Sequence, residues 1–123
     1  MNGKKELGTW GEEKAALYLR MHGYRVVEQN FRCRQGEIDI IARKGDIIAF
    51  VEVKLRKNAD HGEAREYVTA SKQRRIITAA ELWLVRTGCE LQPRFDVIEI
   101  YAREGIRTLC PGIRHLENAF SCD

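Results

Sequence analysis

Hydrophobic residues recur along this chain with two different periods, and the changes between them divide it into predicted helices and strands. From about residue 5 to residue 22 the spacing is mostly helical, and Gly23 follows as the kind of residue that commonly ends a helix. Residues 24–31, 37–42 and 47–55 are instead rich in β-branched residues and are separated by short turn sequences. The pattern therefore predicts one helix followed by an antiparallel meander of three strands.

The helical period returns in the second half of the chain. After a polar loop over residues 56–68, with a short helical turn near residues 63–68, Thr69 or Ser71 can cap a second helix that runs to about Thr87. Gly88 is placed to end this helix. Its apolar spacing predicts an inward face formed by Ile76, Ala79, Ala80, Trp83 and Leu84.

Residues 95–101 alternate between apolar and polar, which predicts a fourth strand with one face exposed to solvent. Beyond it we expect one short strand or turn and a last helical segment. A crossover through the second helix can return the fourth strand parallel to the third. The predicted fold class is therefore α/β: a central mixed sheet flanked by helices, in the order α-β-β-β-α-β.

Length and composition fit a single domain spanning residues 1–123. Charged residues make up 32 % of the chain and hydrophobic residues 44 %, which is typical of globular proteins and excludes the disordered and membrane-embedded classes. The formal net charge of +3 permits a polyanionic partner without requiring one.

The ends and the cysteines indicate where the protein works. No apolar segment follows the first lysines, so we expect no secretory signal, and no apolar run approaches the roughly 20 residues that span a bilayer. The four cysteines are scattered, without a C-x-x-C pair or a histidine at ligand spacing. We therefore expect a cytoplasmic protein with reduced thiols, no membrane association and no zinc site.

Charged residues interrupt the two most apolar predicted strands. Glu37 and Asp39 share one face of the second strand, and Glu52 and Lys54 share one face of the third. If residues 45–46 form a two-residue type II′ turn, Asp39 lies opposite Glu52; a four-residue loop sets Glu37 there and Asp39 on the diagonal. A three-residue loop would put the carboxylates on opposite faces.

Two carboxylates on one face can share a hard divalent cation such as Mg²⁺, which lowers the pKa of a bound water and stabilises charge on a phosphoryl group. Lys54 could then hold the nucleophilic water or neutralise developing charge. The alternative is a solvated strip of cross-paired charges on the outside of a hairpin. Because residues 47–51 are apolar on both faces, as in a covered central strand, we favour a functional site.

Several short motifs at these positions resemble known proteins. Asp39 followed by Glu52-Val53-Lys54 resembles the D…(D/E)-x-K signature of the restriction-endonuclease-like superfamily. A wider set of motifs comprises GxxGE at 8–12, GEID at 36–39, FVEVK at 50–54, RFDV at 94–97 and HLENAF at 115–120. This set, which covers almost the whole chain, resembles the UPF0102 (YraN-type) family of small bacterial proteins, which is similar to archaeal Holliday-junction resolvases.

The resemblance implies a restriction-endonuclease-like fold and a metal-dependent endonuclease that hydrolyses phosphodiester bonds in DNA, including branched or structured DNA. It implies Asp39, Glu52 and the backbone carbonyl of Val53 as ligands of Mg²⁺ or Mn²⁺, with Lys54 near the attacking water. Glu12 matches a helix glutamate that reaches the same metal cluster in the resolvase-like branch. Its alternative role is that of a first-turn glutamate stabilised by the helix dipole. Resolvase-like relatives act as dimers, so a homodimer is also implied.

Basic and polar residues near the proposed site are candidates for binding nucleic-acid phosphates. The candidates are Arg56, Lys72, Gln73 and Arg75, of which Lys72 and Gln73 are the strongest and Arg56 comes next. Arg56 lies just beyond Lys54, and the family's downstream helix commonly carries a polar residue toward the site, a position that Lys72 and Gln73 match. Each could instead belong to a solvated helix face or polar loop. A nucleic-acid-binding module that kept the fold without cleaving is the alternative to the enzyme.

Overall fold

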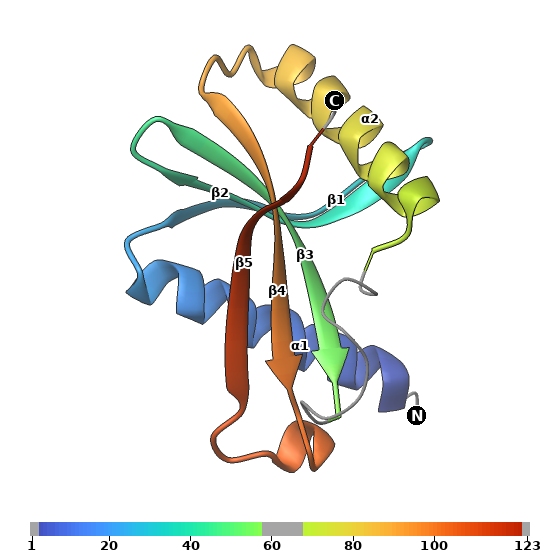
Figure 1. Ribbon diagram of the computed structural model, residues 1–123, viewed down its shortest axis with the longest axis vertical. Coiled ribbons are helices and arrows are strands. Elements are labelled where there is room, and N and C mark those ends of the chain that lie inside the picture. Colours follow the sequence, from blue (N-terminus) through green and yellow to red (C-terminus); the bar gives the residue numbers. More distant parts are fainter. Residues whose placement is uncertain (1–2, 58–67, 122–123) are drawn as a thin grey trace.

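A five-stranded mixed sheet forms the centre of the molecule (Figure 1). The computed structural model describes residues 3–57 and 68–121, so most of the helical turn expected near residues 63–68 lies outside the described residues. The elements are α1 (Gly3–Met21), β1 (Arg25–Cys33), β2 (Gly36–Lys44), β3 (Ile47–Arg56), α2 (Ala70–Thr87), β4 (Gln92–Tyr101), a 3₁₀ turn (Gly105–Arg107) and β5 (Gly112–Phe120). The predicted α-β-β-β-α-β order of an α/β fold is confirmed, with one strand added at the end. Neither described helix is long and apolar enough to cross a membrane.

The strands lie in the spatial order β1-β2-β3-β4-β5. The first three form the predicted antiparallel meander, and β4 returns through α2 to pair in parallel with β3. β5 then pairs antiparallel with β4 and closes that side of the sheet. The predicted meander and helical crossover are therefore both confirmed.

Each face of the sheet is covered by one helix and has its own apolar core. The α2 face contains the predicted Ile76, Ala79, Ala80 and Trp83, packed with Ile48, Phe50 and Phe95. The α1 face contains Ala15, Ala16 and Leu19, packed with Ile40, Val51 and Ile98. The strands between them are covered on both sides, so a charged side chain near the middle of the sheet must find a partner within the protein.

The caps of α2 agree with the sequence prediction. The Thr69 hydroxyl accepts a hydrogen bond from the backbone N–H of Lys72 at 3.1 Å, which satisfies one of the helix's free N-terminal donors. Gly88 ends the helix in the left-handed conformation, and its N–H donates to the Leu84 carbonyl at 2.9 Å. Lys72 is thereby held in the first turn of α2.

Two sequence predictions for the last third of the chain are wrong. The expected solvent-exposed face of β4 is covered, and its acids Asp96 and Glu99 are both 0 % exposed. The expected final helical segment is instead the nine-residue strand β5. The physical reason is shared: the edge of β4 needs a hydrogen-bonding partner, and β5 supplies it while its side chains help to bury the acids.

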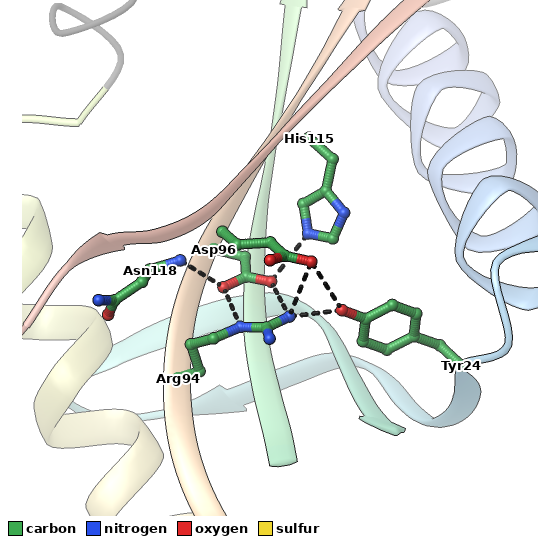
Figure 2. Close-up of polar contacts among 6 residues, drawn as sticks. Tyr24, Arg94, Asp96, His115 and Asn118 are labelled. Atoms are coloured by element: carbon green, nitrogen blue, oxygen red, sulfur yellow. Dashed lines mark hydrogen bonds and ion pairs between the residues drawn. The ribbon is translucent and has the colours of Figure 1, made fainter. Parts of the chain in front are cut away.

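Figure 2 shows the polar contacts that surround the carboxylate of the buried Asp96. Both of its carboxylate oxygens accept hydrogen bonds from the guanidinium of Arg94, at 2.9 and 2.8 Å. His115 Nε2 lies 2.8 Å from Oδ2, and the N–H of Asn118 donates to Oδ1 at 3.0 Å. Burial by itself would raise the pKa of Asp96, but these hydrogen bonds and the charge of Arg94 lower it overall.

Replacement of Asp96 by Asn is expected to destabilise the protein by about 3 to 5 kcal/mol at pH 7, because it leaves the Arg94 guanidinium without its buried carboxylate. Since the folded-state pKa of Asp96 lies below its unfolded value, the carboxylate's contribution is fully present above about pH 4 and is lost as the pH falls. Urea denaturation at pH 7 and pH 3 measures this difference.

The difference in stability between wild type and Asp96→Asn should shrink at pH 3. Asp46→Asn, in an exposed turn, serves as the control and should change stability little at either pH. Equal stability of wild type and Asp96→Asn at pH 7 would contradict the structural role assigned to this cluster.

Candidate functional site

The centre of the candidate site is a point where two neighbouring strands separate. β2 and β3 pair from Lys44 and Ile47 at the turn to Ile40 and Val51. Beyond that point β2 continues along β1, whereas β3 continues along β4. In Figure 1 the β1–β2 hairpin accordingly points in a different direction from the end of β3. We call this opening, bordered by Asp39 on β2 and Glu52 on β3, the fork.

The turn of the β2–β3 hairpin determines which side chains meet at the fork. Lys44 pairs with Ile47, so residues 45–46 form a two-residue turn, and Gly45 has a φ of +58°. A positive φ at the first turn position is what a type II′ turn requires and what glycine adopts without strain. The first of the two expected registers is therefore confirmed. In this register the pair that follows Ile40 and Val51 is Asp39 and Glu52.

The Asp39 side chain takes the place of a backbone hydrogen-bond acceptor that β2 no longer supplies once it has separated from β3. Its Oδ2 accepts a hydrogen bond from the N–H of Val53 at 2.8 Å. This contact satisfies a strand amide that would otherwise lack its β2 carbonyl. Because the N–H and C=O of a strand residue point toward the same neighbouring strand, the Val53 carbonyl is directed toward the fork as well.

The carboxylates of the fork repel each other in a poorly hydrated position. The pKa of Asp39 is raised to about 8, first by burial and then by the negative charge of Glu52, against the lowering effect of the Val53 N–H. Glu52 itself is only 6 % exposed. At neutral pH the fork therefore holds a proton on Asp39 unless a cation takes its place.

Glu12 approaches the fork from α1. That helix begins at Gly3, so Glu12 lies in its interior and the alternative of a first-turn glutamate is wrong. A Cβ at Gly11 would lie only 2.9 Å from the Leu55 side chain, so glycine allows α1 to pack closely on β3. Burial and the charges of Glu37 and Glu52 raise the pKa of Glu12, while a hydrogen bond with Asn30 opposes them.

Lys72 brings a cation to the fork from α2. Its Nζ lies 2.5 Å from Oε2 of Glu52. Burial would lower the pKa of Lys72, but the hydrogen bond and charge of Glu52, followed by the charges of Asp39 and Glu37, raise it overall. The structure thus places a predicted phosphate-binding lysine in direct contact with a predicted metal ligand.

The remaining predicted site residues lie at different distances from the fork. Lys54 is half-buried on the same face of β3 as Glu52, and within the described residues no hydrogen bond or ion pair engages its ammonium group. Arg56 is instead turned to Glu99, with Nε 2.8 Å from Oε2, and its side chain is 17 % exposed. Gln73 donates to the Val68 carbonyl at 3.1 Å, which ties it to the start of α2.

A basic groove adjoins the fork between the β1–β2 turn and α2. Its volume is about 550 Å³, and the residues that line it include Arg32, Arg34, Gly36, Glu37, Lys72 and Arg75. Arg75 is exposed, and Arg32 forms an exposed ion pair with Glu37 at 3.2 Å. Lys72 lines the groove and also contacts Glu52, so the groove adjoins the fork.

The donor atoms at the fork are of the kind that a hard divalent cation prefers, but they do not form a full set of side-chain ligands. It offers two carboxylates, a backbone carbonyl directed to the same side and Glu12 nearby, all oxygen donors of the kind that Mg²⁺ and Mn²⁺ prefer. The Lys72 ammonium already occupies a cation position beside Glu52. Among the described residues, no three His, Cys, Asp or Glu side chains are arranged as a metal-binding group.

Asn30 is a site residue that the sequence interpretation overlooked. It has a φ of +55° within β1, a left-handed conformation that asparagine tolerates better than most residues. Its side chain lowers the pKa of Glu12 as a hydrogen-bonding neighbour, which places it beside the fork. The available signal was an asparagine inside a segment otherwise predicted as a strand, where this residue type is depleted.

The chain is similar to a large set of bacterial proteins. The sequence model of the uncharacterised protein family UPF0102 matches residues 11–100. A UPF0102 protein of Geobacter sulfurreducens is 47 % identical over 117 residues, covering 94 % of this chain and 89 % of the relative. One of Symbiobacterium thermophilum is 44 % identical over 94 % of this chain and 97 % of its own length. One of Caldicellulosiruptor saccharolyticus is 42 % identical over 95 % and 98 %, respectively.

The raised pKa of Asp39 predicts an unusual pH dependence in the presence of EDTA. Between about pH 4 and pH 8 the folded protein keeps the Asp39 proton, whereas the unfolded chain loses it. Wild-type stability should therefore fall as the pH rises through this window, by at most about 1.4 kcal/mol per pH unit for one proton. Asp39→Asn removes this effect and retains an acceptor for the Val53 N–H.

Urea denaturation at pH 5, 6, 7 and 8 should show Asp39→Asn gaining stability relative to wild type as the pH rises. Asp46→Asn at the opposite end of the hairpin is the matched control, with no such trend expected. A difference between wild type and Asp39→Asn that stays constant over these pH values would show that Asp39 ionises normally.

Proposed function

This chain belongs to the UPF0102 family, and from that premise and the geometry of the fork we propose that it is a metal-dependent endonuclease. The substrate that we propose is DNA, including branched or otherwise structured DNA, and the reaction is hydrolysis of a phosphodiester bond. The observation that carries this proposal is the placement of two repelling carboxylates, Asp39 and Glu52, at the point where β2 and β3 separate.

The architecture supports assigning the domain to the restriction-endonuclease-like fold. An antiparallel meander leads through a helical crossover to a strand parallel to its third member. The acid-x-lysine sequence Glu52-Val53-Lys54 lies on that third strand, and Asp39 lies across the fork from it. The fold thus brings together the residues whose order in the chain resembles the superfamily signature.

A functional role accounts for charges that the fold does not need. Interactions within the protein leave Asp39 with a raised pKa and leave Glu52 dependent on a lysine from another element. The Val53 N–H needs one acceptor at Asp39, which an uncharged side chain could supply, so the fold does not require two neighbouring carboxylates. Groups with strongly perturbed pKa values beside an accessible groove are typical of functional sites.

The proposed roles follow from the position of each group. Asp39, Glu52 and the Val53 carbonyl would hold Mg²⁺ or Mn²⁺, which when bound supplies stabilisation of charge on the phosphoryl group and acidification of water. The Lys54 ammonium, on the same face as Glu52, would hold the attacking water or a phosphate oxygen. Glu12 has a raised pKa and would accept a hydrogen bond or proton from water at the fork.

The basic groove would bind the DNA backbone beside the fork. Arg32, Arg34 and Arg75 line it, and arginine binds phosphates with a fixed, bidentate geometry. Such contacts position a nucleic acid without reading its sequence. Arg56 and Gln73 do not line the groove, so we assign the principal phosphate contacts to the three groove arginines and Lys72.

A nucleic-acid-binding module without cleavage is the second candidate. It is favoured by the lack of a completed group of three metal-ligating side chains among the described residues, while the basic groove is already formed. Under either function we propose a cytoplasmic location, since Cys33, Cys89 and Cys110 are free thiols. A homodimer, implied by the resemblance to resolvases, stays a prediction.

Cleavage assays on linear, forked and four-way DNA test the enzymatic proposal. Wild type should cut at least one substrate with Mg²⁺ or Mn²⁺ and should not cut in EDTA. Asp39→Ala and Lys54→Ala are each expected to reduce cutting by on the order of 100-fold or more, because each removes a group acting on the reacting phosphate. Asp46→Ala is the control and should cut like wild type.

The outcomes separate the two candidates. Binding of every DNA form without metal-dependent cutting would favour the module over the enzyme. Cutting that survives both Asp39→Ala and Lys54→Ala would contradict the assignment of the fork as the active site. A wild-type protein that neither binds DNA nor takes up metal would contradict both candidates.

DNA binding in EDTA tests the groove separately. Arg75→Gln should weaken binding to a short duplex and reduce the slope of log affinity against log salt by about one, the change expected when one phosphate contact is lost. Arg43→Gln removes the same charge from the exposed hairpin end and should leave the slope unchanged. Equal effects of the two variants would indicate attraction by net charge rather than binding in the groove.

A further inference from the structure

Lys72 occupies a position that its own helix does not favour. It lies in the first turn of α2, where the helix dipole is positive and where no acidic residue is present. The interaction of the Lys72 ammonium with the dipole of α2 is therefore unfavourable. Its favourable interaction is with Glu52, which belongs to β3 and whose carboxylate lies 2.5 Å from the ammonium.

Lys72 also borders the basic groove. The other cations around this hollow are Arg32, Arg34 and Arg75. Their positive charges repel the ammonium while the groove is empty, whereas a phosphate bound there would attract it. The Lys72 side chain thus lies between Glu52, which holds it through an ion pair, and a groove whose attraction for it would increase with an anion bound.

We propose that Lys72 is an exchangeable counter-cation, which neutralises Glu52 in the metal-free protein and gives up this position to a divalent cation. The released ammonium then faces the groove and adds to its attraction for phosphate. This inference rests on the proposed metal site. It makes metal uptake at the fork and phosphate binding in the groove mutually favourable, because each frees or attracts the same side chain.

Comparison of the Lys72–Glu52 pair with the Arg56–Glu99 pair shows why Lys72 can exchange. Arg56 and Glu99 have side-chain exposures of 17 % and 0 %, and Glu99 also accepts a hydrogen bond from the Tyr101 hydroxyl at 2.8 Å. Lys72 is 41 % exposed, and it carries a compact charge on a flexible stem. Because the Lys72 side chain is partly exposed to solvent, its release does not require the sheet to open.

Calorimetric titration of Mn²⁺ into the intact chain tests the exchange directly. Lys72→Gln should bind Mn²⁺ on the order of tenfold more tightly than wild type, because the competing cation has been removed. Lys72→Arg keeps a cation with more donors and should bind Mn²⁺ no more tightly than wild type. Arg74→Gln removes the same charge from an exposed position on the same helix and should change the affinity by less than about twofold.

A second measurement does not depend on tight metal binding. In EDTA, Lys72→Gln should unfold at a lower temperature than wild type, since Glu52 loses its partner, and saturating Mn²⁺ should remove this difference. Arg74→Gln should match wild type in both conditions. Lys72→Gln with unchanged or weaker Mn²⁺ affinity would overturn the inference, whether or not its thermal stability falls.

The outcomes distinguish failure of this inference from failure of the proposed function. Tighter Mn²⁺ binding by Lys72→Gln, in a protein whose wild type cleaves no DNA, would support the exchange and refute the endonuclease. DNA cleavage by wild type together with unchanged Mn²⁺ affinity in Lys72→Gln would support the endonuclease and refute the exchange. Absence of Mn²⁺ binding by both wild type and Lys72→Gln would overturn both.

Discussion

The hydrogen bond from the Val53 N–H to the Asp39 carboxylate is the contact on which the candidate site depends. β3 must leave β2 in order to remain paired with β4, and this separation would leave a strand amide without a partner. An aspartate side chain provides the missing acceptor and is thereby fixed at the opening. The same interaction that lets the sheet divide therefore holds a carboxylate beside Glu52, where two like charges require a proton or a cation.

The protein treats the buried acid Asp96 and the acids of the fork in opposite ways. Asp96 is surrounded by donors from Arg94, His115 and Asn118, which lower its pKa and leave it no capacity for a ligand. At the fork, Asp39 has one backbone donor and a neighbouring negative charge, and its pKa is raised. The first arrangement connects β4 to β5 as a structural element, whereas the second remains electrostatically unsatisfied in the manner of a binding site.

Much of the fold was predictable because local patterns determine it. Apolar periodicity located both helices and the first four strands, Thr69 was one of two candidate caps for α2, and Gly88 marked its end. The two-residue turn at Gly45 was one of the expected registers of the β2–β3 hairpin. The prediction was wrong for β5 and for the buried face of β4. There the outcome depended on which distant segment satisfied the edge of β4, and local propensity contains no information about such a choice.

The sequence by itself determined which acids could meet at the fork, since the alternation of strand side chains puts them on one face when the turn has two or four residues. The structure selected the two-residue turn, which sets Asp39 opposite Glu52. Only the tertiary structure decided what surrounds them. Helix packing across the sheet brings Glu12 from α1 and Lys72 from α2 to the same opening and turns Arg56 toward Glu99 instead. These partners are far apart in the chain, and the rotation and position of each helix on the sheet depend on the whole core.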